Sequence, residues 1–142
     1  MTIKQASVLL SRVALFVLYF WFGLLKVINM SPASDMVHKV FDTTLGYVPF
    51  LSFGIFFILF GLLEVLIGIL FIIPNLERYA INLFFLHIIA TILPLFILSE
   101  VWTAMFVPTL EGQYIVKNLA LIACVFTVWS SIPKKLPVDV II

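Results

Sequence analysis

Two ionisable side chains stand in the middle of long apolar stretches of the sequence. Glu64 lies in the stretch 50–73, and His87 lies in the stretch 79–98. An acid or a histidine in apolar surroundings is costly, so it usually has a partner or a function. A carboxyl and an imidazole can pass protons or orient a polar ligand. Glu64 and His87 are therefore the first candidate site.

Their positions along the chain indicate that the two side chains meet. The segment 74–78 alone separates the two stretches, and so short a connection makes two helices antiparallel neighbours. Glu64 is nine residues before Ile73, and His87 is eight residues after Tyr79. At 1.5 Å per residue, both lie roughly 12–14 Å from the shared loop. We therefore expect Glu64 and His87 to lie at the same level of the two helices and to form a pair.

A stripe of small residues accompanies the acid. Gly54, Gly61 and Gly68 recur every seven residues, and Glu64 lies on the face that they form. Small residues let a second helix approach closely, so we expect Glu64 to face other helices. Two interpretations of its pair with His87 stay open. The pair carries protons or orients a ligand, or it only holds two helices together.

A second polar set lies where three apolar stretches begin or end. It consists of Lys26, Trp102, Lys117 and Asn118. These side chains could line an outward-facing vestibule that binds a polar headgroup or ligand. Ordinary anchoring of lysine and tryptophan at a membrane interface is the open alternative. Arg12 is fourteen residues before Lys26, and we interpret it as an anchor near lipid phosphates.

Other chemistry has little support in the sequence. Cys124 is the single cysteine, so the chain has no internal disulfide, and we expect a buried, inert thiol. The histidines and the cysteine lack metal-ligand spacing, so no metal site is predicted. A phosphate-binding glycine loop and a hydrolytic triad are also missing. The chain has no complete catalytic motif of its own.

The composition indicates what kind of chain carries these residues. Of its 142 residues, 64% are hydrophobic and 11% are charged, and the mean hydropathy is +1.27. Soluble domains are about 45–50% apolar and about 25% charged. Eight Lys and Arg against seven Asp and Glu leave no basic excess for nucleic acid. A soluble enzyme, a disordered tail and a nucleic-acid binder are excluded, and an integral protein of the lipid bilayer is predicted.

Four stretches are long enough to cross a membrane as helices, which takes about 20 apolar residues. They cover approximately residues 6–28, 50–73, 79–98 and 114–131. The predicted fold is an all-α membrane protein, a four-transmembrane-helix bundle that forms a single domain over residues 1–142. Pro94 is expected to loosen one backbone hydrogen bond of the third helix.

The connections differ in what they predict. In the connection 29–49, Ser31-Pro32 resembles a helix start and Gly46 a stop, and one face is apolar through Met36, Val37, Val40 and Phe41. We therefore expect a short amphipathic helix on the outer surface. The connection 99–113, with Trp102, suits the membrane interface or a shallow re-entrant turn.

Basic residues favour one orientation. Those at one side of the four spans are Lys4, Arg12, Arg78, Lys134 and Lys135, and those at the other side are Lys26, Lys39 and Lys117. Cytoplasmic loops carry the larger share of Lys and Arg. This distribution and the even number of spans predict that both termini lie in the cytoplasm.

Three motifs in order resemble the DoxX-like family of small four-helix membrane proteins, including its YkgB-like branch. After Arg12, the first helix ends in Phe20-Trp21-Phe22-Gly23-Leu24-Leu25-Lys26, similar to the family's Gly-x-x-Lys. The second contains Gly61-Leu62-Leu63-Glu64-Val65-Leu66-Ile67-Gly68, similar to its Glu and Gly pattern. The fourth begins around Gly112-Gln113-Tyr114-Ile115-Val116-Lys117-Asn118, similar to its Lys-Asn or Lys-Asp entry.

The resemblance implies a four-helix bundle associated with redox chemistry in a bacterial inner membrane. Some relatives resemble subunits of thiosulfate:quinone oxidoreductase, and others act in oxidative or chlorine stress defence. More distant relatives resemble receptor-assembly chaperones. The chain would then be the membrane subunit of an oxidoreductase, with a quinone as its cofactor.

Three functional hypotheses follow. In the first, the chain is a quinone- or lipid-interacting subunit of a redox system. Glu64 and His87 carry protons, Lys26, Lys117 or Trp102 binds the polar head, and a partner protein supplies electrons. In the second, it is a non-enzymatic membrane scaffold or assembly factor. In the third, it is a small proton-coupled transporter that works as a homo-oligomer.

Overall fold

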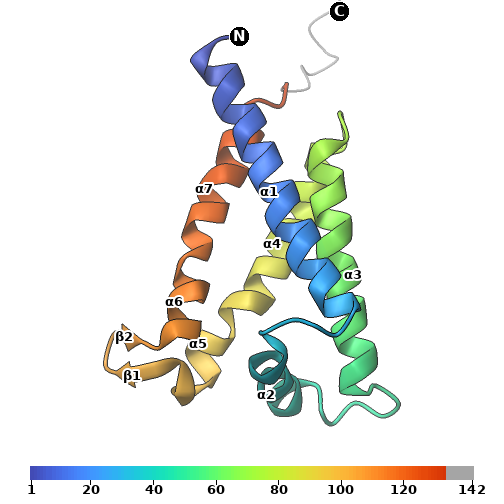
Figure 1. Cartoon of the computed structure of the whole chain (residues 1–142), viewed down its shortest axis with the longest axis vertical. Helices are drawn as coiled ribbons and strands as arrows, with labels where there is room; N and C mark the ends of the chain where they lie inside the picture. The colour runs from blue at the N-terminus through green and yellow to red at the C-terminus, as the bar shows by residue number, and fades with distance from the viewer. Residues whose placement is uncertain (134–142) are drawn as a thin grey trace, which may run out of the picture.

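A computed structural model describes residues 1–133 of the chain (Figure 1). Within this range, four helical segments are long and apolar enough to cross a membrane, as expected from the sequence. They are Ile3–Val27, Phe53–Ile72, Glu77–Ile97 and Leu110–Trp129. The chain runs alternately down and up through them, so that the N-terminus and the turn between the second and third segments lie at one end (Figure 1).

The first two segments are single helices, α1 (Ile3–Val27) and α3 (Phe53–Ile72). The third is interrupted, because Pro94 has no N–H to continue the ladder of α4 (Glu77–Ile92), and a short α5 (Pro94–Ile97) follows. Pro94 was expected to loosen one backbone hydrogen bond, and the structure has an interruption between α4 and α5 at this place. The fourth consists of α6 (Leu110–Val116) and α7 (Asn118–Trp129), separated at Lys117.

The fourth segment begins earlier than the sequence suggests. Its start was expected near residue 114, but α6 begins at Leu110. The reason is a helix cap that the apolar pattern does not reveal, since the Thr109 side chain accepts a hydrogen bond from the backbone N–H of Gly112.

The short helix predicted in the first connection is present as α2 (Ser34–Thr44). The helix start expected at Ser31-Pro32 is wrong by two residues, because the Ser31 hydroxyl accepts from the N–H of Ala33 and closes a turn ahead of the helix. Phe41 is the buried residue of α2, and its ring packs against Phe53 and Phe56 of α3.

The connection after α5 contains a hairpin that the sequence analysis missed. A 3-10 turn, η1 (Ser99–Val101), leads into two antiparallel strands, β1 (Trp102–Ala104) and β2 (Val107–Pro108). Lys39 of α2 donates to the Glu100 carboxylate and joins α2 to this connection. The same hydrogen bond raises the pKa of Lys39 above its ordinary value. Over residues 1–133 the fold is therefore helical, with a small hairpin at the end opposite the N-terminus.

Close contact between α1 and α3 depends on glycine. A Cβ added at Gly23 would lie 2.6 Å from the carbonyl oxygen of Gly61, and one added at Gly68 would lie 2.8 Å from the backbone nitrogen of Phe20. Gly54 has no such neighbour within 4 Å, so the expected stripe is used at Gly61 and Gly68 only. Towards the N-terminal end, α1, α3, α4 and α7 enclose a core that includes Leu15, Ile67, Phe71, Phe84, Ile88, Val125 and Val128.

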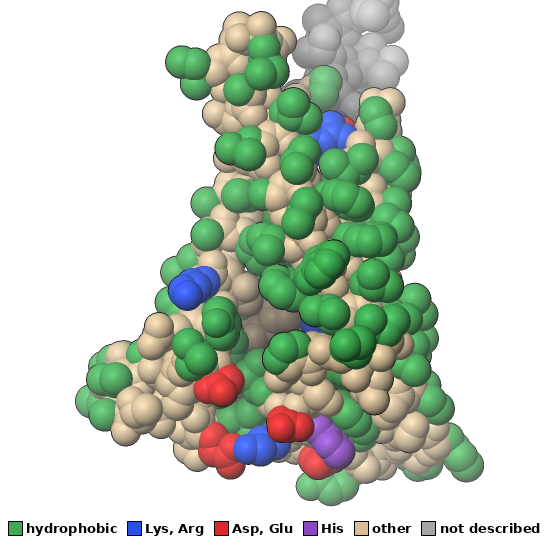
Figure 2. All heavy atoms as spheres, in the orientation of Figure 1, with side chains coloured by type: hydrophobic (Ala, Val, Ile, Leu, Met, Phe, Trp, Pro, Cys, Tyr) green, Lys and Arg blue, Asp and Glu red, His purple; other side chains and the backbone are tan. Residues whose placement is uncertain are grey.

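The outer surface of the four helices is apolar. Hydrophobic side chains cover most of their length in Figure 2, and most of the acidic side chains visible in this view gather at the end opposite the N-terminus. Leu66, Leu86 and Leu119, on three different helices, are 47%, 64% and 67% exposed. Surfaces of this kind match lipid tails better than water.

Candidate functional site

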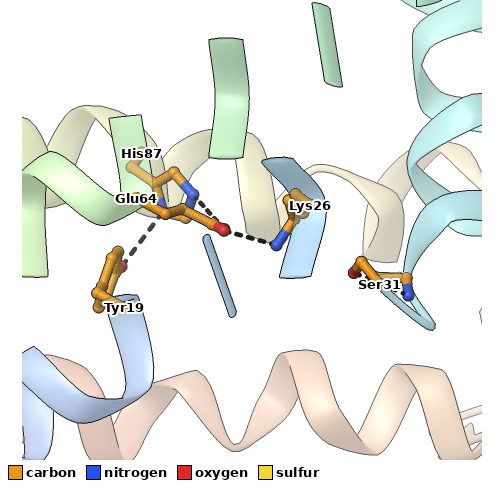
Figure 3. A network of polar contacts seen from close by, with 6 residues as sticks. Tyr19, Lys26, Ser31, Glu64 and His87 are labelled. Carbon is orange, nitrogen blue, oxygen red and sulfur yellow. Dashed lines mark hydrogen bonds and ion pairs between the residues drawn. The ribbon is translucent and has the colours of Figure 1, made fainter. Parts of the chain in front are cut away.

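Four polar side chains from three helices form a connected cluster inside the bundle (Figure 3). Lys26 Nζ of α1 donates to Glu64 Oε2 of α3 at 2.6 Å. The other carboxylate oxygen, Oε1, lies 2.9 Å from His87 Nε2 of α4. The second ring nitrogen of His87, Nδ1, lies 3.2 Å from the Tyr19 hydroxyl of α1. Glu64 is thus bound between an ammonium group and an imidazole.

The backbone of α1 brings Lys26 to the acid. Tyr19, Gly23 and Lys26 are four and three residues apart, so they share one face of α1. At Gly23 the helix backbones touch, because an added Cβ would lie 2.7 Å from the backbone nitrogen of Val65 and 2.8 Å from Glu64 Cβ. Gly61 has the same role on α3, where an added Cβ would lie 2.7 Å from Lys26 Cβ. Each charged residue thus follows a glycine by three residues, and the contact at these two glycines fixes where along α1 and α3 the ion pair forms.

Aromatic rings pack against the cluster and help to bury it. The Phe60 ring stacks on His87 with 4.7 Å between centroids, and Tyr19 meets His87 edge-on at 5.2 Å. The ammonium of Lys26 lies 5.9 Å from the Phe60 centroid. The side chains of Lys26 and Glu64 are each 7% exposed. In such surroundings charges interact much more strongly than in water.

The geometry favours one distribution of protons. A lysine ammonium donates to a glutamate carboxylate, and His87 Nε2–H donates to the second carboxylate oxygen. His87 Nδ1 then accepts from the Tyr19 hydroxyl, which has no other side-chain partner within residues 1–133. Every buried side-chain nitrogen and oxygen atom in that range has a partner. The cluster is neutral as a whole, with one positive and one negative charge.

This arrangement can move a proton over a short path. Glu64 is hydrogen-bonded to two basic groups, so a proton can shift between Lys26, Glu64 and His87 along these hydrogen bonds. A ligand that binds Lys26 would release one carboxylate oxygen of Glu64. Proton transfer and ligand orientation are both chemically available at this site.

The pairing of Glu64 with His87 follows the sequence prediction, but the position of Lys26 does not. Lys26 was expected at the outer boundary with Lys117, whereas it is buried against Glu64. The physical reason is that α1 is displaced along α3, so that the end of α1 meets the middle of α3 (Figure 1). Tyr19 was missed, although it is seven residues before Lys26 and hence on the same helix face.

The rest of the second polar set does not join the cluster. Lys117 is exposed, with its ammonium 4.9 Å from the centroid of the Tyr114 ring of the same helical segment. The Trp102 indole N–H donates to the carbonyl of Leu95. Asn118 is half-buried at the first position of α7. The vestibule expected from Lys26, Trp102, Lys117 and Asn118 is therefore not assembled as one site.

Arg12 has protein partners where lipid phosphates were expected. Its Nε and Nη2 donate to the last carbonyls of α3, those of Phe71 and Ile72, at 2.8 and 3.0 Å. Its Nη1 lies 2.6 Å from Glu77 Oε1 in the first turn of α4. Arg12 thus caps α3 and joins the turn between α3 and α4 to α1.

Two further expectations concern metals and thiols. Within residues 1–133, no group of three His, Cys, Asp or Glu side chains could hold a metal ion. Cys124 is partly buried and packs against the hydrophobic core. A packed thiol of this kind behaves as a small apolar side chain.

No protein-family model matches the chain, and searches of curated protein sequences and of solved structures found no match. The resemblance to the DoxX-like family stays a prediction from the three motifs. Two of these motifs have a structural explanation, since their Gly-x-x-Lys and Gly-x-x-Glu form the contact between α1 and α3.

Proposed function

We propose that the chain is an integral membrane protein that binds a quinone or a lipid-like ligand and exchanges protons with it, as a subunit of a redox system. The observation that carries this proposal is the position of Glu64 between Lys26 and His87, buried at the middle of the helices. Ionisable groups inside a membrane protein mostly serve ion or ligand pathways.

The distribution of apolar and basic residues supports the membrane location. Four apolar segments with exposed hydrophobic side chains fit a bilayer. Three basic residues lie towards the end of the molecule that carries the N-terminus, namely Lys4, Arg12 and Arg78. Lys134 and Lys135, which also support this orientation, lie outside the described residues. We propose both termini in the cytoplasm of a bacterial inner membrane.

Quinone chemistry would use the cluster as a proton relay. Reduction of a quinone to a quinol consumes two electrons and two protons. A partner protein with a redox cofactor would supply the electrons, and His87, Glu64 and Lys26 would relay the two protons from water to the quinone. Lys26 is the cation that could bind the quinone oxygen. The resemblance to DoxX-like proteins supports this redox role.

Ligand binding can be tested by thermal unfolding of the purified protein in detergent. Ubiquinone and menaquinone analogues should raise the melting temperature of the wild type and fail to raise that of Glu64→Gln. Glu111→Gln, at an exposed acid of α6, is the matched control and should respond like the wild type. No shift with either analogue would remove the quinone proposal.

A scaffold or assembly factor is the second candidate, and one observation favours it. The four polar groups satisfy one another within residues 1–133, as the parts of a structural clamp would. This candidate predicts stable co-purification with another membrane protein. It also predicts that Lys26→Met, although destabilising, keeps cellular function wherever the protein still folds.

A further inference from the structure

Two adjoining hollows lie at the end of the bundle that carries the turn between α3 and α4. The first runs between α4 and α7 and is lined by Ile81, Phe85, Phe126 and Trp129. The second is more polar and is lined by Asn75, Tyr79 and Ser131, among others. Arg78 and Asn82 line both hollows. Ile132 and Pro133 also line both hollows, so we describe the two as one groove with an apolar part, a polar part and Arg78 and Asn82 at the junction.

One face of α4 and one face of α7 form the apolar part. The ring of Phe85 lies 6.1 Å from Phe126 and 6.3 Å from Trp129, measured between centroids. Phe126 and Trp129 are 52% and 51% exposed, so the walls of the groove are open to the surroundings. Polarity therefore decreases from Arg78 at the start of α4 to Phe85, two turns further into the bundle.

The junction is positively charged. Nη2 of Arg78 donates to the carbonyl of Pro133, and no acid pairs with Arg78 within residues 1–133. The neighbouring cation, Arg12, is neutralised by Glu77, the acid that lines the polar part. In the same range, the Asn82 amide makes no hydrogen bond to another side chain or to the backbone.

We propose that this groove binds an anionic phospholipid of the cytoplasmic leaflet, with the phosphate at Arg78 and Asn82 and an acyl chain along Phe85, Phe126 and Trp129. The order of charge, amide and aromatic rings matches the order of phosphate, glycerol and acyl chain in the lipid. Anionic lipids are concentrated at cytoplasmic surfaces, and basic pockets between transmembrane helices bind their headgroups. The inference rests on the proposed membrane location, but not on the ligand of Glu64.

Native mass spectrometry of the full-length protein, supplied with equal amounts of phosphatidylglycerol and phosphatidylcholine, tests the site. The wild type should retain phosphatidylglycerol preferentially. Arg78→Gln should lower this preference about fivefold, the effect of one basic residue at a membrane surface, and Arg78→Lys should keep most of it. Trp129→Ala should lower the retention of both lipids. Lys117→Gln, at an exposed cation of the opposite end, is the control and should have no effect.

Other occupants give different results. Equal preference in Arg78→Gln and the wild type would overturn the proposal, and so would loss of the preference in Lys134→Gln/Lys135→Gln alone. A gain in lipid retention after removal of residues 134–142 would overturn it as well, because the tail would then be the occupant. Glu64→Gln should retain phosphatidylglycerol like the wild type. Failure of this site and failure of the quinone proposal are therefore seen in separate assays.

Discussion

The ammonium of Lys26 lies 2.6 Å from the carboxylate of Glu64, and each side chain is 7% exposed. The two residues come from different helices, and glycine-to-glycine contact between α1 and α3 sets their distance. In a pair as buried as this, each charge is compensated only while the other is present. Removal of one partner from a buried pair costs about 3–5 kcal/mol, whereas replacement of both is often close to neutral.

A double-mutant cycle should therefore be strongly non-additive. Lys26→Met leaves a buried carboxylate, and Glu64→Gln leaves a buried ammonium, so each should lower the free energy of unfolding by about 3–5 kcal/mol. The double variant should lose much less than the sum of the two, because neither charge remains. Chemical unfolding in detergent measures all four proteins. Lys117→Met serves as the control for loss of an exposed lysine, and additive losses at Lys26 and Glu64 would contradict the pair.

The close approach of α1 and α3 gives a second prediction. Gly23→Ala and Gly61→Ala should each destabilise by about 1–3 kcal/mol, since the added methyl groups would overlap backbone or Cβ atoms of the other helix. Gly54→Ala is the matched control, because its methyl group would meet no atom within 4 Å. That variant should be neutral or up to about 1 kcal/mol more stable, since alanine favours helix. Equal effects at Gly54 and Gly61 would disprove the packing argument.

The sequence was sufficient for the features that depend on length and local pattern. Apolar length predicts the four helical segments, and the short connection 74–78 places Glu64 and His87 at one depth. The apolar face of Phe41 and its neighbours predicts α2. Each of these features depends on residues close together in the chain.

The position of Lys26 could not be derived in the same way. It depends on how far α1 is displaced along α3, and the connection 28–52 is too long to fix that displacement. Hydropathy placed Lys26 at a boundary, because a lysine near a helix end usually reaches the interface. The usable signal was the repeated spacing of Gly23 to Lys26 and of Gly61 to Glu64. The hairpin of β1 and β2 is too short for a pattern with a period of two residues to be detected.

The stabilisation from the ion pair between Lys39 of α2 and Glu100 should depend on pH in the alkaline range. Hydrogen bonding to Glu100 raises the pKa of Lys39 in the folded protein. The pKa of lysine in the unfolded chain is about 10.4. A lysine whose pKa is higher in the folded protein contributes its full stabilisation at pH values below about 10.4. This contribution is lost as the pH rises through the pKa of the folded protein. The stability difference between the wild type and Lys39→Gln should therefore be constant near pH 8 and shrink above about pH 10. A difference that grows with pH would contradict the ion pair.

The cap that Arg12 places on α3 gives the last prediction. Arg12 donates to two carbonyls and to Glu77, whereas Glu77 takes part in a single one of these bonds. Hydrogen bonds of charged groups contribute about 1.5–3 kcal/mol each, so Arg12→Gln should destabilise more than Glu77→Gln. Arg12→Lys should restore little, since an ammonium cannot hold two carbonyls and a carboxylate in the geometry of a planar guanidinium.

Hydrogen exchange locates that effect. The N–H of Ile73 is bonded to Ile69 at the end of α3, and its exchange should become faster in Arg12→Gln because the last turn frays. The N–H of Leu45, bonded to Phe41 in α2, is the internal control and should exchange at the wild-type rate. If Arg12 only anchored the protein to lipid phosphates, Ile73 would exchange at the same rate in both proteins in a neutral detergent, where no phosphate is present.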